Sequence, residues 1–563
     1  MILSPKPPQT IEMRSAFVTL VSLFLCQAGI AGDAPAITAV SPPGVQLGTS
    51  VEVKLTGKPG DGPLQVWLSC SGLTWKISEK GDSALVTATE QAIPGLHWIR
   101  FHNQFGATEL RPFFVGVIPE AVDTEPNNTL AEAQVLTQPS VLMNGVLEKA
   151  GEVDVWAVDV PANRTLVAAM QANSKLGSPM DGVLQVLDAA GTVVAQNDDD
   201  HGFDPLVTWT PKEASRLYVR TFAFPSQPNS TVRLAGAATY VYRLTITTEA
   251  YVDHVSPLAV NGAAPEVVAV HGWNISDELK SIQPVRSDGG ATVFQGLANA
   301  HHLTSSDLTP LVESDSATAI PLGHSLTGMI AQHKEKDTFQ LPGEKGQKLK
   351  VAVACRAVDS LLDPVLIVRN ADGSVLKEVD DRSRSDLDCE AIVTLPAEGC
   401  TAEISDRYLK GGPRFYYLLT VSEPTPHLKP TVAATKFAVT TDKPLEIPVT
   451  IGRQNGFAEK VTVRMDGLPE SLVCSSVESP NEGDAAKTVK LQVSVAGAGI
   501  PAWSGPVQVR CISESTEFTA EATIPSFSAT TSTIWLSHPE IAAAEEKPED
   551  ETDSESKTEK PSE

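Results

Sequence analysis

The stretch DTEPNNTLAEAQ, at residues 123–134, gathers oxygen-bearing side chains just before a long β-rich run. Two acids, one proline and two asparagines stand within its first six residues. Carboxylate and amide oxygens are the ligands that Ca²⁺ prefers, so the stretch could form part of a metal clamp. The alternative is a polar linker that Pro126 stiffens and in which the asparagines cap turns.

A second acidic cluster, NDDDHGFD at residues 197–204, resembles a calcium loop in composition but not in order. The EF-hand pattern requires Gly at its sixth position and Glu at its twelfth. Counted from Asn197, these positions hold Gly202 and Thr208, so the match fails. The acids recur later in the chain, which favours a shared structural loop at a solvated hairpin end. They are Asp198, Asp199 and Asp204, repeated as Asp380, Asp381 and Asp386.

The motifs of the common hydrolases are missing from the sequence. There is no HExxH, and GHSLTG places Thr327 where the nucleophile elbow requires Gly. That stretch also precedes a strand rather than a helix, so Ser325 is interpreted as structural. His301 and His302 are adjacent and would face opposite sides of a strand. Because every segment is assigned to a β domain, we predict that the chain is not an enzyme.

Internal repeats indicate the architecture that positions these residues. NGVLEKAGEVDVWAV resembles TGMIAQHKEKDTFQL, and SPMDGVLQVLDAAGTVVAQNDD resembles SLLDPVLIVRNADGSVLKEVDD. Apolar residues alternate at period two, and Gly stands where hairpin turns need positive φ. A fainter repeat relates ITAVSPPGVQLGTSVEVKLTG to VDHVSPLAVNGAAPEVVAVHG. The predicted fold class is all-β, with tandem antiparallel β-sandwich or jelly-roll domains.

The paired repeats resemble bacterial pre-peptidase C-terminal domains. The matching motifs are EPNNTLAEAQ, NGVLEKAGEVDVWAVDV, SPMDGVLQVLDAAGTVVAQNDD and YRLTI. The resemblance implies accessory jelly rolls, and in calcium-binding members the entry segment and the acids before the second strand converge on the ion. It therefore implies a structural Ca²⁺ site at Glu125, Asn127, Asn128, Glu152 and Asp154. The second copy keeps Glu335 and Asp337 but has no EPNN equivalent, which makes calcium a weaker expectation there.

These patterns divide the chain into seven predicted parts. They are an export signal at 1–32 with Met13 as an alternative start, an immunoglobulin-like sandwich at 33–118, the first jelly roll at 119–249, a short immunoglobulin-like domain at 250–318, the second jelly roll at 319–423, an immunoglobulin-like sandwich at 424–528, and an acidic disordered tail at 529–563. The export signal is recognised by a basic residue, an apolar core and small residues after it.

Cysteine usage fits an exported chain without a disulfide scaffold. Six cysteines follow the predicted signal, which is few for more than 500 residues. Cys474 and Cys511 lie in one predicted β domain and are the best candidates for a disulfide. No segment after the signal is long and apolar enough to span a membrane.

Charge and composition narrow the function classes. The net charge of -26 disfavours nucleic acid as a partner. We expect an exported, non-enzymatic binding or structural protein at the periplasm, cell surface or outside the cell, with glycan, matrix or an envelope protein as partner. The alternative is an accessory or targeting subunit of a secreted peptidase or hydrolase. Trp67, Trp75, Trp209 and Trp273 could stack on sugars, with core packing as the competing interpretation.

Overall fold

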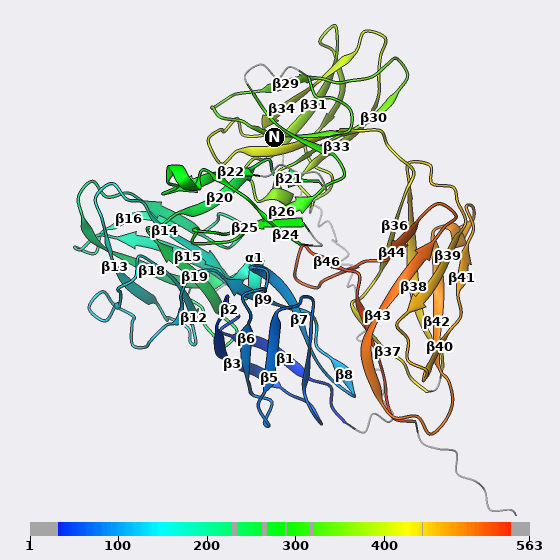
Figure 1. Cartoon of the computed structure of the whole chain (residues 1–563), viewed down its shortest axis with the longest axis horizontal. Coiled ribbons are helices and arrows are strands. Elements are labelled where there is room, and N and C mark those ends of the chain that lie inside the picture. Colours follow the sequence, from blue (N-terminus) through cyan, green and yellow to red (C-terminus); the bar gives the residue numbers. More distant parts are fainter. Residues whose placement is uncertain are drawn as a thin grey trace, which may run out of the picture.

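The computed structural model describes residues 32–227, 233–261, 267–287, 290–314, 319–384, 386–441 and 443–541. Its regular structure is almost entirely β-strand (Figure 1), which confirms the predicted all-β class. The short helices are α1 (Asn173–Leu176) and the 3₁₀ turns η1 (Asp277–Leu279), η2 (Arg356–Val358) and η3 (Asp484–Ala486). Among the described residues, no helix has the length and apolarity needed to cross a bilayer. The predicted export signal, apart from its last residue, and the acidic residues after 541 lie outside the described chain.

The described residues form five modules that follow one another, each with two main sheets and its own apolar core. Module 1 contains β1 (Ala36–Ser41), β2 (Gly44–Gln46), β3 (Ser50–Lys58), β4 (Gln65–Leu68), β5 (Leu73–Ile77), β6 (Ser83–Ala88), β7 (Gly95–Asn103), β8 (Gly106–Ala107) and β9 (Arg111–Gly116). Module 2 contains β10 (Glu120–Val122), β11 (Gln134–Leu136), β12 (Ser140–Val146), β13 (Asp154–Val160), β14 (Leu166–Gln171), α1, β15 (Met180–Leu187), β16 (Val193–Asn197), β17 (Leu206–Trp209), β18 (Ser215–Pro225) and β19 (Val241–Thr247).

Modules 3 and 4 occupy the middle of the chain. Module 3 contains β20 (Tyr251–Ser256), β21 (Ala259–Val260), β22 (Val268–Trp273), η1, β23 (Ser281–Ile282), β24 (Val285–Ser287), β25 (Gly290–Val293) and β26 (His301–Ser305). Module 4 contains β27 (Thr309–Val312), β28 (His324–Met329), β29 (Asp337–Gln340), β30 (Lys348–Ala354), η2, β31 (Pro364–Asn370), β32 (Val375–Val379), β33 (Cys389–Thr394), β34 (Cys400–Asp406) and β35 (Tyr416–Ser422).

Module 5 ends the described chain. It contains β36 (His427–Val432), β37 (Lys436–Ala438), β38 (Leu445–Gln454), β39 (Val461–Asp466), β40 (Leu472–Cys474), β41 (Val477–Ser479), η3, β42 (Thr488–Val495), β43 (Trp503–Ile512), β44 (Glu517–Thr519), β45 (Ala522–Thr523), β46 (Thr530–Thr531) and β47 (Ile534–His538). Its two main sheets have the orders β36-β38-β42-β40 and β37-β47-β43-β39-β41.

Modules 2 and 4 have the same topology, as their sequence repeat predicts. One sheet has the order β10-β12-β19-β14-β17 in module 2 and β27-β28-β35-β30-β33 in module 4. The other has the order β13-β18-β15-β16 and β29-β34-β31-β32, with β11 added in module 2. Both modules begin with a short strand parallel to the next, β10 with β12 and β27 with β28. In β30, Leu349, Val351 and Val353 point into the core because they alternate with outward residues.

Modules 1 and 3 also share a local design. The pair β1–β3 and the pair β20–β22 are antiparallel, and each contains an irregularity opposite a glycine. Gly57 and Gly272 take φ values of 131° and 156° there. A Cβ at either position would lie 2.2 Å or 2.1 Å from the carbonyl oxygen of Ala36 or Tyr251. Only glycine therefore fits the bulge.

Two predicted boundaries are wrong because short strands join sheets that lie far away in the sequence. β27 pairs with β28, so module 4 begins no later than residue 309 rather than at residue 319. β47 pairs with β37 and β43, and Trp535 is only 2% exposed. Module 5 thus extends past residue 528, and the acidic tail cannot begin at residue 529. These strands are too short to be recognised without their partners.

The disulfide proposed from the sequence is not formed. All six cysteines of the described chain are free thiols. Cys474 lies in β40 and Cys511 in β43, which belong to different sheets of module 5. Cys511 is fully buried and packs in the core of this module. Both residues behave as small apolar side chains.

Module 5 returns to module 1 and closes the chain on itself. In Figure 1 the orange strands of module 5 lie beside the blue strand β8. The buried Arg100 donates to the carbonyl oxygen of Thr435 at 3.1 Å, and its guanidinium lies 5.5 Å from the ring centroid of Trp535. Trp98 of module 1 packs edge-on against Phe527 of module 5, with centroids 4.9 Å apart.

Candidate metal centre in module 2

The EPNN segment connects the two sheets of module 2. It leaves β10 at residue 123 and reaches β11, in the other sheet, at residue 134. The amide of Asp123 donates to the carbonyl oxygen of Asn144 in β12 at 3.1 Å. Farther along, the carbonyl oxygen of Asn127 accepts from the amide of Val155 in β13 at 3.0 Å. The segment is therefore tied to the strand that begins with Asp154.

Three carboxylates converge where the segment meets β13. Asp123, Glu125 and Asp154 each offer one oxygen, and these oxygens all lie within 4.8 Å of one another. Asp154 is fully buried, Asp123 is half-buried and Glu125 is exposed. Such a set, open to solvent on one side and closed on the other, suits a hard divalent cation.

A tyrosine hydroxyl forms a hydrogen bond with the buried carboxylate of Asp154. The hydroxyl of Tyr242, in β19, donates to Oδ2 of Asp154. Gly145 pairs with Tyr242 across β12 and β19, and a Cβ there would lie 2.0 Å from Tyr242 Oη. Glycine is required at this position because the phenol ring lies across the backbone of its neighbour. The second carboxylate oxygen of Asp154 remains directed toward the EPNN segment.

Burial and mutual repulsion change the acidity of the cluster. Burial, together with the charges of Asp123, Glu125 and Glu152, raises the pKa of Asp154 to about 8, although the Tyr242 hydrogen bond acts in the opposite direction. Burial and the charge of Glu125 raise the pKa of Asp123 to about 7. A bound cation would take the place of these protons and stabilise the ionised carboxylates against burial and mutual repulsion.

The amide of Asn127 adds a fourth polar group to the centre. Its side chain is fully buried between two acids. With its nitrogen toward them, it donates to Asp154 Oδ1 at 3.3 Å and to Glu125 Oε1 at 3.1 Å. With its oxygen toward them, three oxygens face one another, an arrangement that only a cation makes favourable. The carboxylates and this amide offer the oxygen ligands that Ca²⁺ accepts.

The five ligands implied by the resemblance occupy unequal positions. Glu125 and Asp154 belong to the converging set, and Asn127 lies beside both. Asn128 Nδ2 donates to Glu125 Oε2 at 3.0 Å, so it orients a ligand. Glu152, 3% exposed, accepts from the backbone amide of Lys149 at 2.8 Å and closes a turn.

Asp123 is the residue that the sequence-based ligand set omitted. It stands two residues before the start of the EPNN motif and lies inside the stretch of residues 123–134. Its place beside Asp154 depends on the pairing of β10 with β12, which only the structure shows. The corresponding residue in module 4 is also an acid, Glu313, whose amide donates to Thr327 O at 2.8 Å.

Module 4 keeps the contact between the tyrosine hydroxyl and the aspartate at the start of the strand. Tyr417 donates to Asp337 Oδ2 at 2.7 Å, and a Cβ at Gly328 would lie 2.3 Å from the hydroxyl. Burial raises the pKa of Asp337 to about 6. In the described part of module 4, no group of three ligands converges as in module 2. Residues 315–318, where part of the second copy's entry segment lies, are outside the described chain.

The second acidic cluster forms a structural loop, but the predicted solvated hairpin end is wrong, because the loop joins β16 and β17 of different sheets and Asp204 is buried. An isolated bridge joins His201 to Asp204 in module 2, and an equivalent bridge joins Ser383 to Asp386 in module 4. The buried carboxylate of Asp204 accepts from the backbone amides of Ser174 and Lys175 at 3.1 Å each. It therefore fixes the turn at α1.

The tryptophans considered as a binding platform are distributed over three modules. Trp75 packs edge-on against Phe101 and Phe113 in the core of module 1. Trp273, in module 3, lies under the guanidinium of Arg414. Trp209, in module 2, is 37% exposed at the end of β17 and is available to solvent. Trp67 is half-buried in β4 of module 1.

Comparisons with known proteins show local likeness. No family model matches the chain. A probable subtilase-type serine protease of Deinococcus radiodurans is 30% identical over 86 residues, which are 15% of this chain and 12% of that protein. The chain therefore spans only a small part of this relative's length.

Among solved structures, fibronectin(III)-like modules of Clostridium thermocellum CbhA align with 41% of this chain and 95% of theirs, at 14% identity and a TM-score of 0.13. Native E. coli alpha-2-macroglobulin aligns with 91% of this chain and 47% of its own, at 8% identity and a TM-score of 0.14. Domains 4–9 of surface layer protein SbsC align with 87% of this chain and 83% of theirs, at 11% identity and a TM-score of 0.11. By its own strands and sheets, the chain is a multi-domain β-sandwich protein.

Proposed function

We propose that this protein is an exported, non-enzymatic binding or structural protein whose module 2 holds a structural calcium ion. The partner would be a glycan, a matrix component or an envelope protein. The signal-like N-terminus supports export, and the tandem sandwiches support a binding or spacing role. The chain would act by presenting its modules in a fixed arrangement rather than by catalysis.

The convergence of Asp123, Glu125 and Asp154 carries the calcium proposal. An ion there would join the entry segment to β13 and neutralise acids that repel one another. It would also stiffen the passage from module 1, because Glu120, just ahead of the site, forms a buried ion pair with Arg243 at 2.7 Å, and the Arg243 guanidinium lies 5.4 Å from the ring centroid of Phe114 in module 1. The expected role is therefore mechanical, with the ion ordering a junction between modules.

Thermal unfolding of the full chain, in EDTA and in millimolar calcium, tests this role. Extracellular calcium modules bind with Kd values on the order of 10⁻⁴–10⁻³ M. At ten times Kd, binding adds about 1.4 kcal/mol to the free energy of unfolding, which raises Tm by several degrees. We expect Glu125→Gln to lose this increase and Glu148→Gln, an exposed acid nearby, to keep it. An equal calcium response in both variants would place the ion elsewhere, and no response in the wild type would refute the site.

A second function, as accessory subunit of a secreted peptidase, is supported by the local match to a probable subtilase-type serine protease. Purification of the tagged full chain from its native envelope distinguishes the two functions. A stoichiometric peptidase would support the accessory function, whereas glycan or envelope material would support the binding function.

A further inference from the structure

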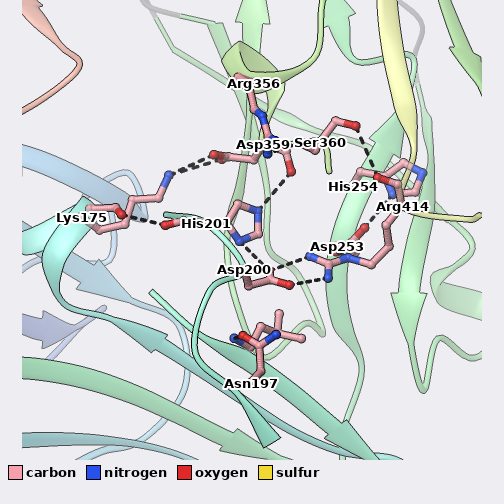
Figure 2. Close-up of polar contacts among 12 residues, drawn as sticks. Lys175, Asn197, Asp200, His201, Asp253, His254, Arg356, Asp359, Ser360 and Arg414 are labelled. Carbon is pink, nitrogen blue, oxygen red and sulfur yellow. Dashed lines mark hydrogen bonds and ion pairs between the residues drawn. The ribbon is translucent and has the colours of Figure 1, made fainter. Parts of the chain in front are cut away.

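Modules 2, 3 and 4 meet around Arg414 (Figure 2). Its guanidinium donates to both carboxylate oxygens of Asp200 in module 2, at 2.7 and 2.8 Å, and to Asp253 in module 3 at 2.7 Å. The two aspartate side chains are only 5% and 6% exposed. The same guanidinium lies 5.5 Å from the ring centroid of Trp273. One cation of module 4 thus holds a carboxylate from each of the other two modules.

His201 stands beside this cation with both ring nitrogens directed at acceptors. Nδ1 lies 2.7 Å from Asp200 Oδ2, and Nε2 lies 3.1 Å from the carbonyl oxygen of Asp359 in module 4, as Figure 2 shows. A neutral imidazole has one N–H and satisfies only one of these contacts, whereas the imidazolium has two and satisfies both. The protonated ring therefore connects modules 2 and 4 directly.

The charge balance of the junction favours the same state. Asp200, Asp253 and Asp359 carry three negative charges, and Arg414 and Lys175 carry two positive charges, with Lys175 Nζ 3.2 Å from Asp359. A neutral His201 leaves one excess negative charge among these five groups, which the imidazolium cancels. A second ring faces the cluster, with His254 Nδ1 3.0 Å from Asp253 Oδ2 in module 3. The other titratable groups around the junction are Asp204, Tyr251, His254, His271, His301, Arg356 and Tyr416.

We propose that this junction is a proton-dependent clamp, in which protonated His201 fastens module 2 to module 4 and loss of the proton loosens the contact. The clamp would make the arrangement of the modules sensitive to the pH outside the cell. Because Asp253 of module 3 shares Arg414 with Asp200, all three modules would respond together.

The acidities of the neighbouring groups agree with this geometry. Burial acts to lower the pKa of His201, but the hydrogen bond and charge of Asp200 and the charge of Asp359 raise it above the usual value of 6.5. Hydrogen bonds from Arg414 and His201 outweigh burial and lower the pKa of Asp200 to about 2, so this carboxylate stays ionised. Because the pKa of His201 is raised in the folded state, its stabilisation is complete below pH 6.5 and is lost as the pH rises through the raised value.

Two other histidines lie near the clamp. Burial lowers the pKa of His301 to about 4, so this ring is neutral at the pH where His201 is charged. The ring of His254 stacks between Tyr416 and His271, with centroids 4.0 and 4.6 Å away. The clamp should therefore be tight in mildly acidic solution, where His201 is charged and His301 is neutral.

Hydrogen–deuterium exchange of the full chain at pH 6 and pH 8.5, corrected for intrinsic rates, tests the clamp. Peptides covering residues 198–204 and 355–363 report the two sides of the contact. In the wild type, we expect the open population to increase by up to about tenfold for each pH unit through which His201 titrates. His201→Gln keeps an amide donor but cannot be protonated, so we expect weak protection at both pH values. His333→Gln, at an exposed histidine of module 4, should behave as the wild type.

Asp359→Asn is a second, independent variant. Asp359 has a φ of 61°, a conformation that asparagine tolerates, so the backbone should be retained. Because the charge of Asp359 raises the pKa of His201, its loss should move the pH range over which the clamp loosens to lower pH. Equal protection of the wild type at both pH values, a wild-type pH response in His201→Gln, or an unmoved window in Asp359→Asn would each overturn the proposal.

Discussion

Replacing Asp154 by asparagine should stabilise the metal-free protein, although the residue is fully buried and hydrogen-bonded to Tyr242. The pKa of this carboxyl is raised from 3.8 to about 8, so folding opposes its ionisation. A pKa that is raised for an acid means that stability is greatest below pH 3.8 and decreases as the pH rises toward the raised value. Asparagine has the same shape as aspartate and carries no charge, and its amide oxygen can accept the hydrogen bond from the Tyr242 hydroxyl.

The size of this stabilisation follows from the difference between the usual pKa of Asp154 and its raised value in the folded protein. Each pKa unit corresponds to 1.36 kcal/mol, so the interval from pH 3.8 to pH 7 gives an upper bound of about 4 kcal/mol. Because Asp123 and Glu125 share the repulsion, the protons are coupled and we expect about 2–4 kcal/mol at pH 7. For a module of this size, that gain corresponds to an increase in Tm on the order of 10 °C.

Differential scanning calorimetry in EDTA, from pH 4 to pH 8, measures the effect. The transition temperature of module 2 should decrease in the wild type as the pH rises. In Asp154→Asn it should hardly change with pH. Millimolar calcium should stabilise the wild type and leave the variant unchanged, which narrows the gap between them.

Asp337→Asn in module 4 is the matched control, because the same tyrosine contact is present but the pKa of the acid is raised only to about 6. It should gain less stability, and its response to calcium should equal that of the wild type, because the site in module 2 is intact. An Asp154→Asn protein that is less stable than the wild type in EDTA would show that the tyrosine contact outweighs the repulsion, and would refute the electrostatic reasoning.

Two further predictions concern packing. Arg243→Met should reduce the free energy of unfolding by about 3–5 kcal/mol in urea titrations, because it leaves Glu120 buried without its ion pair, and adding Glu120→Gln should recover part of the loss. A full loss in the double variant would contradict that account. Gly145→Ala should cost about 1–3 kcal/mol, since its Cβ would meet Tyr242 Oη at 2.0 Å, whereas Gly497→Ala, with 3.9 Å to its nearest neighbour, should remain within about 0.5 kcal/mol of the wild type. Equal stability of the two alanine variants would show that the tyrosine can move.

Local patterns were enough to predict the fold class and the repeat. Alternating apolar residues in stretches such as β30 select one face of a strand, and glycines such as Gly57 mark positions where the backbone excludes a side chain. The same repeat located Asp154 and Asp337 at equivalent strand starts. These signals depend on residues a few positions apart, which is why the sequence carries them directly.

The candidate metal centre was only partly predictable. Glu125 and Asn127 stand in a recognisable motif, but Asp123 joins them because β10 pairs with β12, and Asn128 and Glu152 are directed to other partners. Side-chain direction over a loop is set by its anchoring hydrogen bonds, and composition alone does not contain that information.

By itself the sequence determined the β class, the duplicated modules and the acidic entry segment, since each is written in neighbouring residues. The tertiary structure alone decided which modules touch. Arg100 meets Thr435 across 335 positions, and Arg414 meets Asp200 across 214. Such pairs have no periodic signature, because their partners are selected by the packing of whole modules and by the need to satisfy buried charges. The closed chain, the shared cation and the histidine beside it therefore become visible only when the modules are assembled.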